Sequence, residues 1–189
     1  MPANYSTSDA EELSDDTSFT KNFLYFSYGS NLLKERIHVG ACGAIFVSIG
    51  TLDNFELSFF DHSQRWKGAI ASIEPKENSR VLGCIWQVPY SQLEVLDRQE
   101  VGYHRLKVKI ASYPSLDQVY DCLTYQYSST SRVFATPSPH YKEVIVAGAI
   151  EHKLPKEYIE GLRAIPTNGF IGSVNIDLMA IKHLNENND

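Results

Sequence analysis

The sequence predicts an α+β fold, in which a mixed or antiparallel sheet closes into a small β-barrel flanked by helices. Short apolar and aromatic runs, separated by turn-forming residues, recur through residues 23–127. Helix-like segments dominate the chain after residue 139. Because strands and helices are segregated along the chain, an α+β arrangement is favoured over a doubly wound parallel sheet.

The expected elements follow in chain order. The aromatic run 23–28 predicts a buried first strand, which Gly29 ends and a short helical segment over 32–37 follows. Ser91 and Glu94 form a capping-box pattern, which predicts a helix over 92–98. Further strands are expected over 44–49, 55–60, 68–73, 81–88, 105–111 and 119–127. Further helices are expected over 141–151, 155–164 and 175–184, the second with Pro155 in its first position.

Charge is concentrated at one end of the chain. The 189 residues carry 17 Lys and Arg against 23 Asp and Glu, a formal net charge of −6. Residues 1–20 hold five acidic residues and no basic one, so the rest of the chain is nearly neutral. Nucleic acids and anionic membranes both attract an excess of Lys and Arg. We therefore expect neither a nucleic acid nor a membrane as a partner.

Composition also predicts the domain organisation. Residues 1–20 are rich in Ser, Thr, Asp and Glu, so we expect a disordered acidic tail there, one domain over 21–185 and a frayed end over 186–189. No apolar run approaches the roughly 20 residues of a membrane helix, and the N-terminus resembles no signal or transit peptide. We expect a cytoplasmic protein with reduced cysteines, with the nucleus as an alternative. The His and Cys spacings predict no metal site.

Residues 28–31, Tyr-Gly-Ser-Asn, form the first candidate binding element. A strand that leads through Gly29 into a helix directs backbone N–H groups outward, and such donors suit a carboxylate or a phosphate. The missing side chain of Gly29 lets a ligand approach the backbone closely. The alternative, and the commoner outcome, is an ordinary turn in which Ser30 or Asn31 caps the following helix.

Glu100 is the candidate acid or base. It lies close to Gly102, which is expected to end the helix, so its side chain can point into a cleft beside Tyr103. Aromatic walls favour the neutral carboxyl and bring its pKa toward that of a working acid or base. The alternative is a solvated charge near a helix end. Five of the 11 tyrosines are candidate pocket residues: Tyr25, Tyr28, Tyr103, Tyr125 and Tyr141. The alternative is that they are half-buried residues of the core.

Five short motifs occur in an order that is more specific than any one of them. They are the aromatic strand with Y-G-S-N at 23–33, W-x-G-x-x-A at 66–71, G-x-x-W at 83–86, L-D-x-Q-E at 96–100 and P-S-P-x-Y at 137–141. Together they resemble the γ-glutamylcyclotransferases over about residues 23–172. The turn between Glu100 and Tyr103 is shorter than in some members of that family.

The resemblance implies a cyclising enzyme of γ-glutamyl and glutathione metabolism without a metal or cofactor. The α-amine of a γ-glutamyl amino acid attacks its own γ-carbonyl, releases the amino acid and closes 5-oxoproline. Glu100 would be the general base and acid. The substrate would contact Tyr25, Phe26, Ser27, Tyr28, Gly29, Ser30 and Tyr141, with Asn31, Tyr103 and Tyr125 as candidate pocket walls. Backbone N–H groups over 25–30 would hold the α-carboxylate.

Two alternatives remain open. Related cyclotransferases act on glutathione or on γ-glutamyl-ε-lysine, but their turn motifs typically read Y-G-S-L and Y-G-T-L, so Asn31 favours the γ-glutamyl amino acid class. A catalytically silent protein that binds a γ-glutamyl metabolite or a protein partner is the second alternative, and the presence of Glu100 speaks against it. The resemblance also implies a homodimer, to which Ile176, Met179 and Ile181 would contribute unless they belong to the core.

Overall fold

A closed barrel organises the computed structural model, which describes residues 21–186. Its strands follow the order β1-β3-β2-β4-β5. Every neighbouring pair is antiparallel except β1 and β5, which run parallel and pair at Tyr25 and Leu123. The mixed barrel with flanking helices confirms the predicted fold class. The acidic tail predicted over 1–20 and residues 187–189 lie outside the described residues.

Two of the strands are much longer than the sequence predicts. The strands are β1 (Asn22–Ser27), β2 (Ile45–Ser63), β3 (Gly68–Pro89), β4 (Tyr103–Ser112) and β5 (Val119–Tyr127). The expected strands 44–49 and 55–60 are one strand, β2, and 68–73 and 81–88 are both part of β3. Asn54 and Asn78, which lie between the expected strands, adopt positive φ of 61° inside β2 and β3. The register shifts between Asp53 and Phe55, so a bulge bends the ribbon without ending it.

The helices are short and lie around the barrel. They are the 3₁₀ turn η2 (Ser30–Leu32), α1 (Lys34–Gly40), η3 (Tyr90–Gln92), α2 (Leu93–Gln99), α3 (Pro139–Glu151), α4 (Lys156–Ala164), η4 (Met179–Ile181) and α5 (Lys182–Glu186). Ser138 caps α3 by accepting a hydrogen bond from Tyr141 N–H at 3.1 Å. The capping box predicted at Ser91 and Glu94 is wrong, because Ser91 lies in η3 and α2 begins without a side-chain cap.

The helix predicted over 175–184 is correct only in its second half, because helical structure begins at Met179 with η4 and continues as α5 to Glu186. Val174, Ile176 and Leu178 are all buried, and this period of two belongs to an extended chain rather than to a helix. Ile176 and Ile181 belong to the core, whereas Met179 is exposed. The core alternative is therefore correct for two of the three residues considered for a dimer face, and the homodimer itself stays a prediction.

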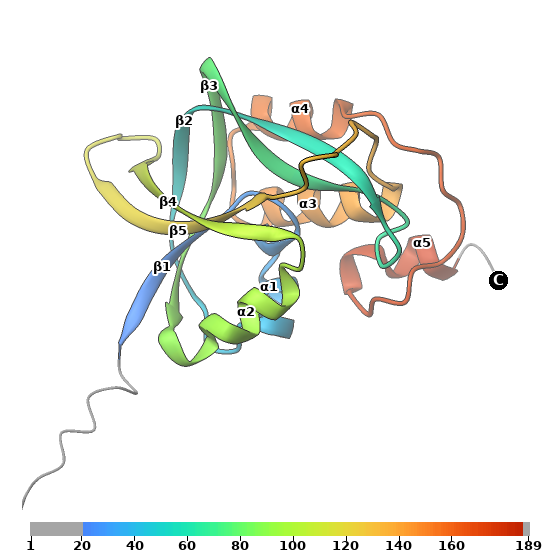
Figure 1. Cartoon of the computed structure of the whole chain (residues 1–189), viewed down its shortest axis with the longest axis horizontal. Helices are drawn as coiled ribbons and strands as arrows, with labels where there is room; N and C mark the ends of the chain where they lie inside the picture. The colour runs from blue at the N-terminus through green and yellow to red at the C-terminus, as the bar shows by residue number, and fades with distance from the viewer. Residues whose placement is uncertain (1–20, 187–189) are drawn as a thin grey trace, which may run out of the picture.

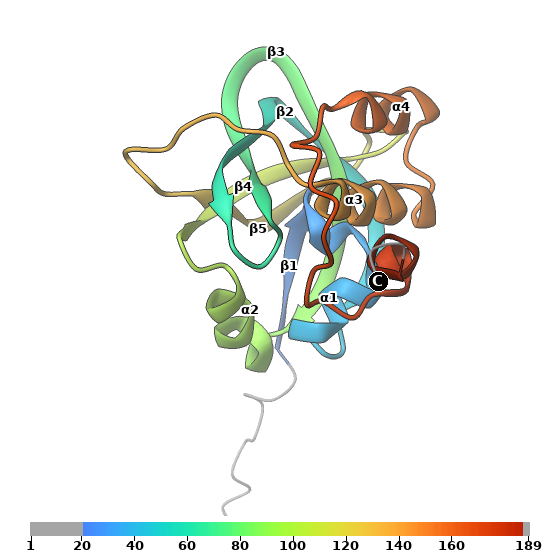
Figure 2. The same cartoon turned by 90° about the vertical axis from the view of Figure 1, so that its right-hand side faces the viewer.

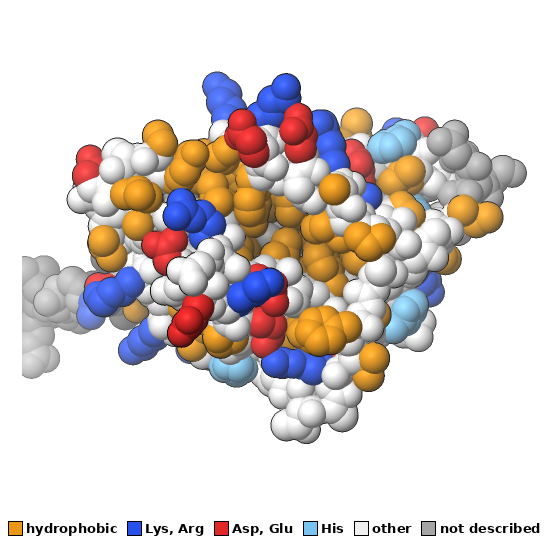
Figure 3. Space-filling model, turned by 90° about the horizontal axis from the view of Figure 1, so that it is seen from above, with side chains coloured by type: hydrophobic (Ala, Val, Ile, Leu, Met, Phe, Trp, Pro, Cys, Tyr) orange, Lys and Arg blue, Asp and Glu red, His pale blue; other side chains and the backbone are white. Residues whose placement is uncertain are grey.

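The helices divide into two groups around the barrel. Figures 1 and 2 show α1 and α2 at one end of the barrel and α3 and α4 beside it. Trp86 and Phe26 are fully buried in the core, where Trp86 Nε1 donates to Ser27 Oγ at 2.9 Å. Seen from above, hydrophobic side chains gather in a hollow with charged side chains around it (Figure 3). Among the described residues, no helix combines the length and the hydropathy of a membrane span.

Helix α3 presses directly on the turn that follows β1. A Cβ atom at Gly148 would lie 2.4 Å from Leu33 N and 2.6 Å from the carbonyl carbon of Leu32, which is closer than real Cβ contacts. Glycine at 148 is therefore what allows the α3 backbone to rest against η2 and to fix the turn in place.

We expect Gly148→Ala to lower the free energy of unfolding by about 2 kcal/mol, because overpacking a core contact forces the backbones apart. Gly161→Ala in α4 is the matched control, since no atom lies within 4 Å of its Cβ position. That change should raise stability by about 0.5–1 kcal/mol through helix propensity. Urea unfolding of both variants measures the contrast, and equal effects would contradict the close packing at Gly148.

Candidate active site

A narrow cavity brings together side chains from seven segments of the chain. It has room for about 30 Å³, which is near the volume that one water occupies in the liquid. It is lined by Tyr25, Tyr28, Gly29, Ser30, Asn31, Ala71, Glu100, Tyr103, Tyr125 and Tyr141. Nine of these ten residues are candidates that the sequence singled out, although they span more than 110 residues of chain.

Two of the predicted substrate contacts do not line this cavity. Phe26 is fully buried, and its ring lies where a Cβ on Gly83 would be, at 2.7 Å. The Ser27 hydroxyl is engaged by Trp86 Nε1. Phe26 and Tyr25 point to opposite sides because side chains alternate along a strand. Phe26 and Ser27 thus lie next to the turn in the sequence but do not line the cavity.

The turn after β1 differs from the predicted one. Residues 30–32 form a single 3₁₀ turn, closed by hydrogen bonds from Leu32 N–H to Gly29 O at 3.0 Å and from Leu33 N–H to Ser30 O at 3.2 Å. The α-helix begins only at Lys34. The first N–H groups of such a turn have no acceptor within it, and the turn that carries them forms part of the cavity wall.

Glu100 lies at the C-terminal end of α2. Its backbone N–H bonds to the carbonyls of Leu96 and Asp97, both at 3.2 Å, and its carbonyl accepts from Tyr103 N–H at 3.0 Å. These bonds turn the chain from the helix directly into β4 and leave the Glu100 side chain in the cavity. The helix end therefore places a carboxylate among tyrosine rings, as the sequence predicted.

Burial raises the pKa of Glu100 from 4.5 to about 7. The positive charge of Arg36 and a hydrogen bond from Asn31 oppose this rise but do not cancel it. A carboxyl group with this pKa exchanges its proton readily near neutral pH, which suits a general base that must also act as an acid.

Asn31 contacts the carboxylate directly. Its Nδ2 donates to Glu100 Oε1 at 3.1 Å and to the Tyr25 hydroxyl at 3.2 Å. Asn31 is buried, and its Oδ1 has no hydrogen-bond partner within residues 21–186. Of the expected pocket walls, Asn31 is thus the one that donates a hydrogen bond to the candidate base.

Most tyrosine hydroxyls in the cavity are used to hold its walls. Tyr28 donates to Tyr125 O at 2.5 Å, Tyr103 to Ala71 O at 2.6 Å and Tyr125 to Asp97 Oδ1 at 2.7 Å. Tyr141 differs, because its hydroxyl accepts from Ala71 N–H at 3.3 Å and its own proton is not committed to a carbonyl. Burial raises the pKa of Tyr141 to about 12, so it remains a neutral donor.

Known proteins resemble this chain in sequence and in fold. The AIG2-like family model matches residues 80–162. Proteins named γ-glutamylcyclotransferase from Mus musculus and Homo sapiens are each 38% identical over 162 residues, which is 84% of this chain and 86% of each relative. The chain belongs to the γ-glutamylcyclotransferase family. A solved γ-glutamyl cyclotransferase structure superposes with a TM-score of 0.79 at 37% identity, covering 87% of this chain and 98% of that one.

Family membership confirms the resemblance that the five motifs carry. The structure explains why motifs so far apart occur together: Y-G-S-N, L-D-x-Q-E and P-S-P-x-Y each supply residues to the Glu100 cavity. Ala71, at the end of W-x-G-x-x-A, binds Tyr103 and Tyr141 through its backbone. Four motifs of this family member therefore converge on one carboxylate.

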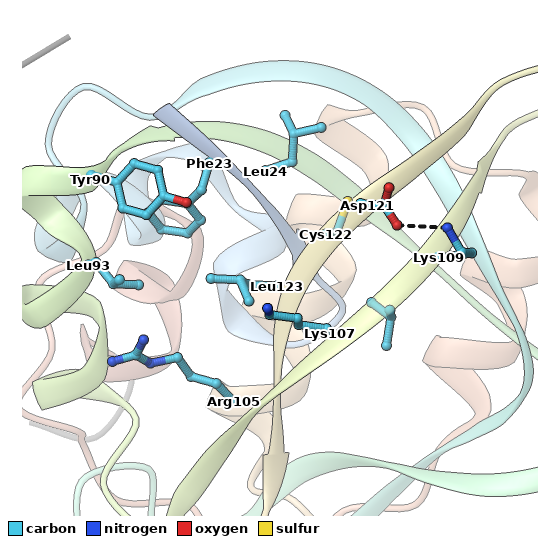
Figure 4. Close-up of a pocket in the computed structure, with 11 residues that line it drawn as sticks. Phe23, Leu24, Tyr90, Leu93, Arg105, Lys107, Lys109, Asp121, Cys122 and Leu123 are labelled. Atoms are coloured by element: carbon cyan, nitrogen blue, oxygen red, sulfur yellow. Dashed lines mark hydrogen bonds and ion pairs between the residues drawn. The ribbon is translucent and has the colours of Figure 1, made fainter. Parts of the chain in front are cut away.

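A larger groove of about 620 Å³ is lined by residues of β1, β4 and β5 and lies beside η3 and α2 (Figure 4). Phe23, Leu24 and Leu123 give it an apolar lining. Its one acidic residue, Asp121, is paired with Lys109 at 2.9 Å. The groove shares no lining residue with the Glu100 cavity and offers no unpaired carboxylate. The smaller cavity is therefore the candidate active site of this γ-glutamylcyclotransferase family member.

Sequence reasoning missed two residues near the site. Arg36 is buried, and its Nη1 donates to Gln99 Oε1 at 3.2 Å. A signal for Arg36 was present, since in the helix predicted over 32–37 position 36 falls on the same face as Leu32 and Leu33, and a charge on an apolar face needs an explanation. Gln99 gave no signal beyond its place in L-D-x-Q-E.

We predict that Glu100 makes the stability of the protein depend on pH. Its folded-state pKa of about 7 exceeds the ordinary value of 4.5, so the stabilising contribution of the neutral carboxyl is present below pH 4.5 and is lost as pH rises through 7. Glu100→Gln stays neutral at every pH. It should exceed the wild type in free energy of unfolding by about 2 kcal/mol at pH 8, with the difference shrinking toward pH 4.

Urea unfolding at both pH values provides the measurement. Glu94→Gln is the control, because Glu94 lies on the same helix with its side chain 86% exposed and should leave the pH dependence unchanged. If the stability gap between Glu100→Gln and the wild type were the same at pH 4 and pH 8, Glu100 would not be desolvated.

Proposed function

We propose that this chain is a γ-glutamylcyclotransferase that converts a γ-glutamyl amino acid into 5-oxoproline and a free amino acid. The observation that carries the proposal is a desolvated Glu100 carboxyl with a pKa of about 7, lodged in a narrow cavity with Asn31 and Tyr141. The relatives named γ-glutamylcyclotransferase support the same activity.

The proposed reaction moves two protons from the attacking nitrogen to the leaving nitrogen. The Glu100 carboxylate removes a proton from the α-ammonium group of the substrate, which makes the nitrogen a nucleophile. That nitrogen forms a bond to the γ-carbonyl carbon. The attacking nitrogen of this adduct still carries two hydrogens and a positive charge. Glu100 returns the first proton to the leaving nitrogen as the bond between that nitrogen and the γ-carbonyl carbon breaks. A second proton then passes from the ring nitrogen to the released amine, which leaves neutral 5-oxoproline and an ammonium group. No water is consumed, and the atoms balance between the substrate and its two products.

Binding of the α-carboxylate is assigned to neutral donors. Gly29 and Ser30 belong to the cavity lining, and backbone N–H groups at the start of a helical turn bind anions. Tyr141 adds a neutral hydroxyl beside them. Holding the glutamyl chain bent, with its amine next to its own carbonyl, supplies the proximity that an intramolecular attack requires. A γ-glutamyl group is larger than one water, so wall side chains must move apart when it enters.

We predict that Glu100→Gln lowers kcat for γ-glutamyl-alanine by at least about 100-fold, because the amide cannot accept a proton. Binding should persist, since the change preserves size and most hydrogen bonding. Release of 5-oxoproline measures turnover, and calorimetry with the same dipeptide measures binding to the variant. Glu94→Gln is the matched control and should retain wild-type turnover. Near-wild-type turnover by folded Glu100→Gln would contradict the assignment of Glu100 as the base.

A substrate panel tests the proposed class. We expect rapid turnover of γ-glutamyl-alanine and at least about tenfold slower turnover of the same dipeptide with its glutamyl α-carboxylate amidated, because charge-assisted hydrogen bonds to an anion are stronger than neutral ones. Glutathione and γ-glutamyl-ε-lysine should react more slowly than γ-glutamyl-alanine. Equal turnover of the acid and of the amide would contradict the proposed binding site for the α-carboxylate. Faster turnover of glutathione than of γ-glutamyl-alanine would identify the enzyme as a cyclotransferase that acts on glutathione.

A further inference from the structure

Arg36 is a buried cation without a direct acidic partner. Its side chain lies inside the protein, with the residue only 5% exposed. Within residues 21–186, no Asp or Glu oxygen lies within 4 Å of its guanidinium, and its Nε has no hydrogen-bond partner. Burying a guanidinium costs free energy unless charges or dipoles compensate. The surroundings of Arg36 must therefore contain that compensation.

The charged and phenolic groups that interact electrostatically with Arg36 show what stabilises its charge. They are the guanidinium of Arg65, the carboxyl of Glu100 and the phenols of Tyr25 and Tyr141. Arg65 repels Arg36, and both tyrosines are neutral at physiological pH. Glu100 is therefore the acid among them whose charge can stabilise Arg36, and the attraction acts equally on both partners.

A second contact joins Arg36 to the end of α2. Arg36 Nη1 donates to Gln99 Oε1 at 3.2 Å, and Gln99 directly precedes Glu100. The Gln99 amide lies across Gly40, where a Cβ atom would be only 1.1 Å from Gln99 Nε2. Arg36 and Gly40 are four residues apart and thus on one face of α1. The absence of a side chain at 40 is what lets Gln99 reach Arg36.

We propose that Arg36 is the positioning residue of the acid–base group: it fixes the last turn of α2 through Gln99 and favours the carboxylate form of Glu100 through its charge. This inference rests on the proposed function for its meaning, although its physical content can be measured without turnover. The first effect acts on the place of the carboxylate, whereas the second acts on the pH at which the carboxylate forms.

Other groups that face Glu100 do not supply the same charge. The polar groups that line the cavity with it are Asn31 from the turn, Tyr25 and Tyr28 from the first strand and its end, Tyr103 from β4, Tyr125 from β5 and Tyr141 from α3. All are neutral near pH 7. Asp97, on the same helix, is bound to Arg105 and Tyr125. Arg36 is thus the cation that lowers the pKa of Glu100.

The pH dependence of kcat/KM separates the two effects. Arg36→Met removes the charge and should move the acidic limb upward by about one pH unit, because an opposite charge nearby lowers a carboxyl pKa by about that much or more. Gly40→Ala displaces Gln99 and keeps the charge. It should leave the midpoint of the acidic limb unchanged. It should also lower kcat by about tenfold, because Glu100 is displaced from its working position. Arg36→Lys should behave like Gly40→Ala.

Arg98→Met is the matched charge control. Arg98 lies on α2 close to Glu100 in sequence, but its side chain is 70% exposed, so solvent and salt screen its charge. Its removal should leave the acidic limb where it is. If Arg36 had a purely structural role, Arg36→Met would lower the rate equally at every pH, and that result would overturn the charge effect.

Carbon-13 NMR of the Glu100 carboxyl tests the proposal without catalysis. The resonance is assigned by its loss in Glu100→Gln, and its titration gives the pKa directly. The value should be higher in Arg36→Met than in the wild type, and an unchanged value overturns the proposal. A wild-type protein that releases no 5-oxoproline would refute the proposed function alone. If Arg36→Met fails to fold, Arg36→Gln supplies a neutral side chain that can still bind Gln99.

Discussion

Desolvation of one carboxyl group is the constraint around which the site is built. Glu100 is surrounded by aromatic rings from both ends of the chain, and the room left beside it is that of about one water. Burial alone would keep the group protonated, whereas the charge of Arg36 and the amide of Asn31 lower its pKa. The resulting pKa of about 7 is a balance between a cost of burial and two compensations, each from a different part of the chain.

The barrel and helices contribute to that balance by closing the walls. Tyr28, Tyr103 and Tyr125 each donate to a backbone carbonyl or a carboxylate rather than into the cavity. These bonds tie neighbouring segments together and hold the rings in place around the cavity. Three tyrosines of the lining thus use their hydroxyl protons within the protein, whereas the Tyr141 hydroxyl, which accepts from Ala71 N–H, is the one that we propose for ligand binding. Residue type alone does not distinguish the two roles.

Local patterns predicted the site better than the details of the fold. Most of the lining could be predicted because the turn after β1 and the end of α2 are short-range features. The long strands could not, since Asn54 and Asn78 relieve a bend by adopting positive φ, which resembles a turn in sequence. The pairing of Arg36 with Gln99 joins residues 63 positions apart. Such a contact depends on how α1 and α2 pack, and no spacing within either helix encodes it.

The narrowness of the cavity has a consequence for which products form. An activated γ-carbonyl can be attacked by its own amine or by water, and the second route would release glutamate. A γ-glutamyl group that displaces the water from this space would leave its own amine as the nucleophile held next to the carbonyl. In the proposed reaction, partitioning between cyclisation and hydrolysis is thus decided by volume. The same narrow cavity that raises the pKa of Glu100 would thus favour closure of the lactam ring over hydrolysis.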